Sequence, residues 1–312
     1  MTILTKLTLK DLQPILDAYN LGSYKSHSHI PHALGNTNYI LTTSKRKYIL
    51  KIFEHSTKKE IQYQLQIEEY LHKHRIPIPR IIHNTKNQAL GIIKEKNFLL
   101  YEFVQGNHLK ELSKALAIDL GKQVGNLHKT LLDLRISYHE KDYAFIEFLR
   151  KQLHKKKISP FLKQEREKTL QELDHLNVQY LRRSIIHSDL HPENILAQKK
   201  ITAFLDWGDV HYDYLIYDLG TLIKNFFVRW RQQDLTYFKL FLKHYQKHIQ
   251  LNVEEQKAIF TMTKVALLIG IQWMEEQEIK HPDKRKELQN DQQKFIHAYQ
   301  NISKLNSKML FS

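Results

Sequence analysis

The chain has 312 residues and no cysteine, so disulfide frameworks, Cys-type zinc sites and a cysteine nucleophile are excluded, and its length suggests two lobes or domains. Hydrophobic residues make up 42% and charged residues 26%, which is ordinary globular composition. The net charge of +15 favours binding to nucleic acid, to an anionic membrane surface or to phosphate-bearing ligands. The basic residues are scattered and do not alternate with aromatic residues, so a nucleic-acid surface is not favoured.

Neither a membrane span nor a signal peptide is expected. The apolar run from Val265 to Ile271 ends at Gln272 and is too short to cross a bilayer. The N-terminus contains no apolar signal segment. We therefore expect a cytoplasmic protein with no membrane partner.

The first hundred residues predict a small lobe of strands with one main helix, which Thr57 can cap. The expected elements are a short helix over 8–20, strands between about 24 and 53 (NYILTT and KYILKIF), the main helix over 57–74, an extended IPIPRII segment, and strands in ALGIIKE and NFLLYEF.

After Asn107 the pattern becomes mostly helical, which predicts an α+β fold with its boundary near 105. We expect an N-terminal lobe at 1–104 and a C-terminal lobe at 105–312. The elements expected in the second lobe are helices at about 110–130, 141–156 and 161–180, a strand-rich island at about 184–206, and helices from there to the end.

The strand-rich island holds the residues best suited to chemistry. Asp189 and Asn194 lie five apart in the polar loop HSDLHPEN, and Asp206 closes the strand ITAFLD. Two carboxylates and a carboxamide at strand ends form a hard-oxygen site suited to Mg²⁺, which favours phosphate oxygens and so points to a nucleotide. A transition-metal site at His187 and His191 is less favoured, because no third clustered ligand follows.

These motifs resemble those of kinases. HSDLHPEN is similar to the catalytic loop H-x-D-x-x-x-x-N, and LDWG is similar to the metal-binding D-F-G or I-D-[FW] motif. Lys51 in KYILKIF resembles the phosphate-contacting lysine of the third strand. A G-x-G-x-x-G-x-V loop, an A-P-E motif and a long activation segment are missing, as in the small-molecule kinases: aminoglycoside phosphotransferases, choline kinases and the second type of homoserine kinase. LGNTNYILTT, HKHRIPIPRII and YDLGTL are most similar to the homoserine kinase branch.

The resemblance implies a bilobal protein-kinase-like fold, with a small antiparallel-sheet N-lobe and a larger, mostly helical C-lobe. It implies transfer of the γ-phosphate of ATP, with Mg²⁺, to a hydroxyl of a small metabolite, homoserine being the leading acceptor. Aminoglycoside and choline or ethanolamine kinases are alternatives in the same superfamily. A catalytically inactive, nucleotide-binding pseudokinase is the alternative from a different class. The sequence does not indicate the oligomeric state.

The resemblance also implies roles for individual residues. Asp189 is expected to accept the proton of the substrate hydroxyl or orient that hydroxyl, and Asn194 and Asp206 are expected to hold Mg²⁺. Asp218 in YDLG is expected to cap a helix or brace the loop.

Nucleotide binding is expected in the N-lobe. Lys51 would contact the α- and β-phosphates, with Glu60 as its partner on the following helix and Glu68 as the second choice. The adenine would be held by the carbonyl of Glu102 and the amide of Val104.

Loop amides around Asn36, Thr37 and Asn38 are expected to cover the phosphates. These amides would replace the missing glycine-rich loop.

The acceptor is less clearly indicated by the sequence. From Trp207 onward, basic residues outnumber acidic ones, which disfavours the acidic cleft that polycationic drugs need. Choline would need an aromatic cage with an acid, and an acceptor ammonium would need a carboxylate. The candidates are Tyr212, Tyr214, Trp230 and Trp273 for the cage, and Glu275 and Glu276 for the ammonium.

Overall fold

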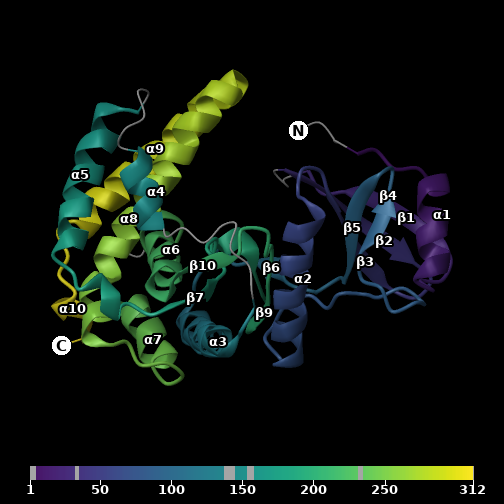
Figure 1. Cartoon of the computed structure of the whole chain (residues 1–312), viewed down its shortest axis with the longest axis horizontal. Helices are drawn as coiled ribbons and strands as arrows, with labels where there is room; N and C mark the ends of the chain where they lie inside the picture. The colour runs from purple at the N-terminus through teal and green to yellow at the C-terminus, as the bar shows by residue number, and fades with distance from the viewer. Residues whose placement is uncertain (1–4, 32–34, 137–144, 153–157, 231–234, 312) are drawn as a thin grey trace. The chain divides into compact units, whose positions relative to one another are not determined.

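Placement is described for residues 5–31, 35–136, 145–152, 158–230 and 235–311 of a computed structural model of the chain (Figure 1). The chain divides into two compact units. The first unit is Met1–Gly106 with Thr202–Gly208, and the second is Asn107–Ile201 with Asp209–Ser312. The predicted boundary near 105 lies beside this division, but the sequence did not indicate that Thr202–Gly208 groups with the first unit.

The first unit is built on an antiparallel sheet of five strands in the order β1-β2-β3-β5-β4. Its strands are β1 (Tyr24–His29), β2 (Asn36–Thr43), β3 (Lys47–Phe53), β4 (Gly91–Ile93) and β5 (Lys96–Glu102), and its helices are α1 (Leu9–Ala18) and α2 (Lys58–Lys73). A capping box begins α2, because the Thr57 hydroxyl accepts the Glu60 N–H and the Glu60 carboxylate accepts the Thr57 N–H. At the start of α1 the Asp11 carboxylate accepts the N–H and the hydroxyl of Thr8.

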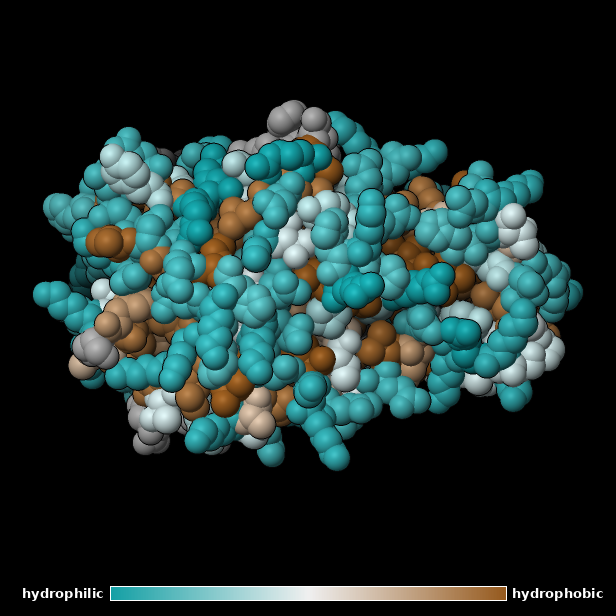
Figure 2. Space-filling view, turned by 90° about the horizontal axis from the view of Figure 1, so that it is seen from below, coloured by the Kyte–Doolittle hydropathy of each residue, from teal (hydrophilic) through white to brown (hydrophobic). Residues whose placement is uncertain are grey.

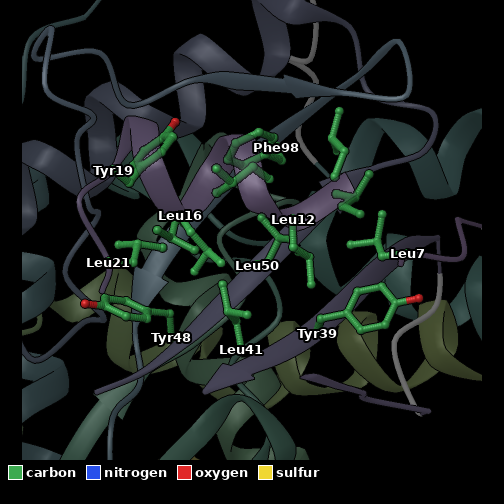
Figure 3. Close-up of a cluster of buried hydrophobic side chains, with 14 residues drawn as sticks. Leu7, Leu12, Leu16, Tyr19, Leu21, Tyr39, Leu41, Tyr48, Leu50 and Phe98 are labelled. Carbon is green, nitrogen blue, oxygen red and sulfur yellow. The ribbon is translucent and has the colours of Figure 1, made fainter. Parts of the chain in front are cut away.

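One face of this sheet packs against α1. Leu12 and Leu16 of α1 lie in a buried cluster with Leu41, Leu50 and Phe98 of the strands (Figure 3). Burial of such a side chain contributes about 1.5–3 kcal/mol. This cluster fixes the register of β3, because a slip of one residue would turn its buried side chains to the other face.

The opposite face of the sheet packs with α2. Ile61 of α2 lies in a second buried cluster with Phe53, Leu99 and Tyr101. Successive side chains of a strand point to opposite faces. Lys51 therefore shares the α2 face with Phe53, and its Nζ lies 5.4 Å from the centroid of that ring.

The second unit is mostly helical, as expected. Its helices are α3 (Lys114–Asp133), α4 (Phe145–Gln152), α5 (Pro160–Asp174), α6 (Leu215–Val228), α7 (Thr236–Tyr245), α8 (Val253–Lys280), α9 (Arg285–Ile302) and α10 (Lys308–Phe311), with 3₁₀ turns η1 (Val178–Tyr180), η2 (Pro192–Asn194) and η3 (Pro282–Lys284). Its strands are β6 (Asn107–His108), β7 (Arg183–Ile186), β8 (Ile195–Ala197) and β10 (His211–Tyr214), and β9 (Ile201–Phe204) leads from this unit into the first.

Close helix contacts and a long apolar helix form the core of the second unit. α3 packs on α7 at Gly121, where a Cβ would lie 2.2 Å from the carbonyl oxygen of Phe241. α8 packs against α5, α6 and α9. By length and composition α8 could cross a membrane, but 78% of its most apolar window is buried inside the protein. On the face shown in Figure 2, hydrophilic residues cover most of the surface, with hydrophobic residues exposed in small areas.

Two local expectations differ from the structure. β10 lies where only helix was expected, because its residues pair with β7. Asn36 and Thr37 lie in β2 and not in a loop, because the ladder with β3 extends to Phe53. Parts of the helix expected at 141–156 lie outside the described residues.

Candidate active site

A lysine and an aspartate form an ion pair in the first unit. Lys51 of β3 is 7% exposed, and its Nζ donates a hydrogen bond of 2.8 Å to Oδ1 of Asp206. Asp206 follows β9 with a φ of +57°, an uncommon backbone conformation for a residue other than glycine. Its side chain stays 56% exposed. The turn thus presents a carboxylate to solvent while Lys51 holds one of its oxygens.

Gly208 keeps space open beside this pair. A Cβ at Gly208 would lie 3.3 Å from Oδ1 of Asp206 and 3.9 Å from Nζ of Lys51. An exposed carboxylate with adjacent space suits a hard divalent cation, which can in turn bind phosphate oxygens.

A buried polar cluster lies near Lys51 on the α2 face. Glu68 is 4% exposed and accepts hydrogen bonds from Nε2 of Gln64 (3.1 Å) and from the hydroxyl of Tyr101 (3.0 Å). Burial raises the pKa of Glu68 to about 7, and the charge of Lys51 opposes that rise. The charge of Lys51 therefore acts on Glu68 as well as on Asp206.

Glu60 has a different setting. It is the third residue of α2, and its carboxylate accepts the backbone N–H of Thr57 at 2.8 Å as part of the capping box. Glu68 lies two helical turns further along α2. Its side chain is buried, whereas that of Glu60 is half-buried. Of the two glutamates, Glu68, the second choice from the sequence, is the buried one, and the charge of Lys51 acts on it.

The three residues expected over the phosphates are strand residues. The hydroxyl of Thr37 donates to Glu54, and Thr37 is 1% exposed. Asn38 is the register partner of Lys51 in the β2–β3 ladder. The loop geometry expected for Asn36 and Thr37 is therefore wrong, whereas Asn38 lies in the expected strand NYILTT, opposite Lys51.

Glu102 and Val104 lie at the end of β5 and just beyond it. The Glu102 side chain forms an ion pair of 2.5 Å with Arg46, and its backbone N–H donates to the carbonyl of Arg80. Because Arg46 holds the Glu102 side chain, that side chain is already engaged. This is consistent with the prediction that Glu102 and Val104 bind adenine through backbone groups.

In the second unit, Asp218 shapes the loop that carries Asp189. Asp218 is fully buried at the start of α6, and its carboxylate accepts the backbone N–H groups of His187 (2.8 Å) and Ser188 (2.6 Å). Ser188 has a φ of +66°, so the chain turns sharply just before Asp189. The expected bracing role of Asp218 is the arrangement found.

The side-chain amide of Asn194 hydrogen-bonds to Asp189. Its Nδ2 donates to the Asp189 carbonyl and to Oδ2 of the Asp189 carboxylate, both at 3.0 Å. An amide that donates through its nitrogen presents its oxygen as an acceptor, which is the atom a hard cation takes. The amide oxygen of Asn194 is therefore a ligand type that fits a Mg²⁺-type ion, as is the exposed carboxylate of Asp206 in the first unit.

Asp189, His191 and Glu193 form a short charge network. His191 contacts Oδ2 of Asp189 at 3.2 Å and Oε2 of Glu193 at 2.8 Å. Burial would raise the pKa of Asp189, but the hydrogen bond and charge of His191 outweigh it and lower that pKa to about 2. The two carboxylates likewise overcome burial and raise the pKa of His191 to about 9. Asp189 is therefore ionised at neutral pH, with 41% of its side chain exposed.

The residues considered for an acceptor cage are not gathered around an open site. Arg183 stacks on the rings of Tyr212 and Tyr214, with 4.8 and 5.6 Å to the centroids. Trp230 is buried, and its Nε1 donates to the carbonyl of Leu109. Trp273 is 44% exposed on α8.

The acids considered for an acceptor ammonium already have hydrogen-bond donors. Glu275 accepts from the Ser159 N–H and from Gln292, and Glu276 accepts from Gln272.

Sequence reasoning missed the cluster around Glu68 and the network around His191. The spacing of Gln64 and Glu68, four apart beside Ile61 and Ile67, was the available signal, because it places both polar residues on a buried helix face. His191 carried only the weak signal of a histidine two residues from an aspartate.

Three comparisons place this arrangement among known proteins. A family model described as the phosphotransferase enzyme family matches residues 27–249. The homoserine kinase of Methylobacillus flagellatus is 26% identical over 278 residues, covering 86% of this chain and 85% of that protein. An amicoumacin kinase solved with AMP-PNP and Ca²⁺ superposes with a TM-score of 0.74 at 18% identity over 96% of each chain. The choline kinase of Streptococcus pneumoniae superposes with a TM-score of 0.65 at 16% sequence identity, over 95% of this chain and 99% of that one.

The match spans well over half of the chain, and it includes Lys51, Asp189, Asn194 and Asp206. The solved structures share the expected α+β, protein-kinase-like fold with an antiparallel sheet and a mostly helical part. This protein belongs to the phosphotransferase enzyme family and is a small-molecule kinase in class.

Proposed function

We propose that this protein transfers the γ-phosphate of ATP to the hydroxyl of a small metabolite, with homoserine as the leading acceptor. The observation that carries the proposal is the Asp189 loop, in which Asn194 and His191 hold an ionised, partly exposed carboxylate. The sequence motif of this loop, HSDLHPEN, resembles the catalytic loop of kinases, and the family match supports that class of enzyme.

The first unit supplies groups for the phosphates. Lys51 would contact phosphate oxygens, and Glu68 would hold Lys51 in place of Glu60. Asp206 would hold the divalent cation, with Gly208 leaving room beside it. When bound, the cation neutralises charge on the β- and γ-phosphates. Glu102 and Val104 would bind the adenine through their backbone.

The second unit supplies the acceptor end of the reaction. Asp189 would orient the acceptor hydroxyl and take its proton. The new bond joins the hydroxyl oxygen to the γ-phosphorus, the bond from that phosphorus to the β-phosphate oxygen breaks, and ADP leaves. A carboxylate with a pKa of about 2 is a weak base, so we attribute most of the rate to positioning and charge neutralisation. Asn194 would present its amide oxygen to the cation.

Homoserine is favoured over the two alternative acceptors. A homoserine kinase covers most of this chain at 26% identity. A choline cage would have to displace Arg183 from Tyr212 and Tyr214. An aminoglycoside would need acidic residues, and Glu275 and Glu276 already accept hydrogen bonds from neighbouring residues. The cytoplasm, where ATP is available, is the proposed compartment.

A coupled assay of acceptor-dependent ADP release tests the proposal. The panel would contain L-homoserine, choline, ethanolamine and kanamycin, each with Mg²⁺ and ATP. Asp189→Ala should lose nearly all turnover and keep ATP binding, whereas Asp206→Ala should also lose Mg²⁺-dependent ATP binding. Asp174→Ala is the matched control, because Asp174 is an exposed acid of the second unit paired only with Arg150 in the contacts described.

The outcomes separate the alternatives. Turnover of L-homoserine that disappears in Asp189→Ala and persists in Asp174→Ala would support the proposal. ATP binding without turnover of any acceptor would favour the pseudokinase. Wild-type rates in both Asp189→Ala and Asp206→Ala would refute the site.

A further inference from the structure

Three buried polar side chains form a closed hydrogen-bond network between α2 and the sheet of the first unit. The hydroxyl of Tyr101 donates to the two carboxylate oxygens of Glu68, at 3.0 and 3.3 Å. Nε2 of Gln64 donates to Oε1 of Glu68 at 3.1 Å and to the Tyr101 hydroxyl at 3.3 Å. Gln64 and Glu68 are 4% exposed, and Tyr101 is 7% exposed. A donor from α2 and a donor from β5 therefore fix where the Glu68 carboxylate lies.

Strand register places this network on the face of the sheet that carries Lys51. Lys51 of β3 pairs with Leu99 of β5. Tyr101 is two residues beyond Leu99, so it points to the same face and lies on the diagonal from Lys51. Tyr101 also belongs to the same buried cluster as Phe53, and the Lys51 Nζ lies 5.4 Å from the centroid of the Phe53 ring. The Tyr101 side chain therefore joins β5, α2 and the surroundings of Lys51.

The network holds a carboxylate where packing alone would favour an apolar side chain. α2 packs on the sheet through apolar residues such as Ile61. Burying a carboxylate is costly unless it is hydrogen-bonded and lies near an opposite charge. Burial raises the pKa of Glu68 to about 7, while the charge of Lys51 and the two hydrogen-bond donors oppose that rise. The donors therefore favour the ionised form of Glu68, which attracts the ammonium group of Lys51.

We propose that Tyr101 and Gln64 are positioning residues for nucleotide binding. They hold the Glu68 carboxylate, which in turn orients the ammonium group of Lys51 toward the phosphates. This inference rests on the proposed function, in which Lys51 contacts phosphate oxygens. The lysine side chain is flexible, so the carboxylates around its ammonium group decide where that charge lies. Asp206 accepts a hydrogen bond from Lys51 at 2.8 Å. Without its two donors Glu68 would rotate away, and Lys51 would lose one of the charges that orient it.

The test compares two ligands that differ only in their phosphates. Binding of ADP and of adenosine, each with Mg²⁺, would be measured by calorimetry in the wild type and in Tyr101→Phe. The variant should bind ADP about 10-fold more weakly, which is the lower end of the range for a hydrogen bond to a charged group. Its affinity for adenosine should be nearly unchanged, because adenosine lacks the phosphates that Lys51 would contact. Unchanged ADP affinity, or equal weakening of both ligands, would overturn the inference.

Tyr39→Phe is the matched control for loss of a buried tyrosine hydroxyl. Tyr39 of β2 is 4% exposed, and its hydroxyl donates to the carbonyl of Thr5 at 3.0 Å. It belongs to the buried cluster on the α1 face of the same sheet (Figure 3). Tyr39→Phe should keep wild-type affinity for ADP and for adenosine. If it weakened ADP binding as much as Tyr101→Phe, the loss would follow from general destabilisation and the inference would be wrong.

A double-mutant cycle tests whether the hydroxyl acts through Glu68. Tyr101→Phe should weaken ADP binding much less in a Glu68→Gln background than in the wild type, because the carboxylate that the hydroxyl holds is gone. The same loss in both backgrounds would overturn the inference. Gln64→Met removes the other donor and should also weaken ADP binding without changing adenosine binding. This second variant keeps the inference testable if Tyr101→Phe does not fold.

ADP binding keeps this inference separate from the proposed function. If the protein binds ADP but phosphorylates no acceptor, the proposed function fails, while the affinities of the variants still test Tyr101 and Gln64. If an acceptor is phosphorylated and Tyr101→Phe binds ADP as tightly as the wild type, only the inference fails. A wild type that does not bind ADP would refute both.

Discussion

Asp218 offers a direct test of how the fold positions the Asp189 loop. Its buried carboxylate accepts two backbone N–H groups, from His187 and Ser188, at 2.8 and 2.6 Å. Asp218→Asn keeps one acceptor oxygen but turns an NH₂ group toward the second N–H. Because a hydrogen bond to a charged group contributes about 1.5–3 kcal/mol, and a neutral one about 1, we expect a loss of about 3 kcal/mol.

The loss should appear in both stability and rate. For a unit of about 200 residues, 3 kcal/mol lowers the melting temperature by about 6–12 °C. Relaxation of the turn at Ser188 would misplace Asp189, and misplacement by about 1 Å can lower kcat about 100-fold. The KM for ATP should change less than kcat, because Lys51 and Asp206, two of the proposed phosphate and cation ligands, belong to the first unit.

Asp213→Asn is the matched control for this experiment. Asp213 is also buried and accepts two backbone N–H groups, from Phe145 and Tyr214, but it does not bond to the Asp189 loop. Differential scanning fluorimetry and kcat per folded molecule should show destabilisation of both variants and a rate loss in Asp218→Asn alone. Full stability and rate in Asp218→Asn would refute the bracing role.

Two further predictions concern stability. The pKa of Glu68 is raised from 4.5 to about 7, so its protonated form stabilises the fold fully below pH 4.5, and about 3 kcal/mol is lost as pH rises through 7. In the wild type, urea unfolding should give a lower free energy of unfolding at pH 8 than at pH 5. If Glu68→Gln showed the same decrease between the two pH values, the decrease could not be attributed to Glu68. Gly121→Ala should cost about 1–3 kcal/mol, because the new Cβ would approach the Phe241 carbonyl at 2.2 Å. An unchanged urea midpoint would contradict that contact between α3 and α7.

Local patterns in the sequence were sufficient for the main elements. The capping residues Thr8 and Thr57 and the apolar stripes behind them predicted α1 and α2, since helix ends and amphipathic faces are local properties. Alternation in KYILKIF predicted β3 and therefore the position of Lys51 within a strand. The spacing of Asp189, Asn194 and Asp206 predicted a hard-oxygen site suited to Mg²⁺, and the resemblance of their motifs to those of kinases implied the phosphotransferase class, which the family match confirms.

Contacts between distant segments decided what the sequence left open. Glu60 and Glu68 both lie on α2, and only the packing of α2 on the sheet shows that Glu68 is the buried one. β10 has no strong local signal and exists because β7 pairs with it. Asp218 reaches the Asp189 loop from thirty residues away. Burial, charge environment and strand pairing depend on neighbours that are far apart along the chain, so only the tertiary structure could determine them.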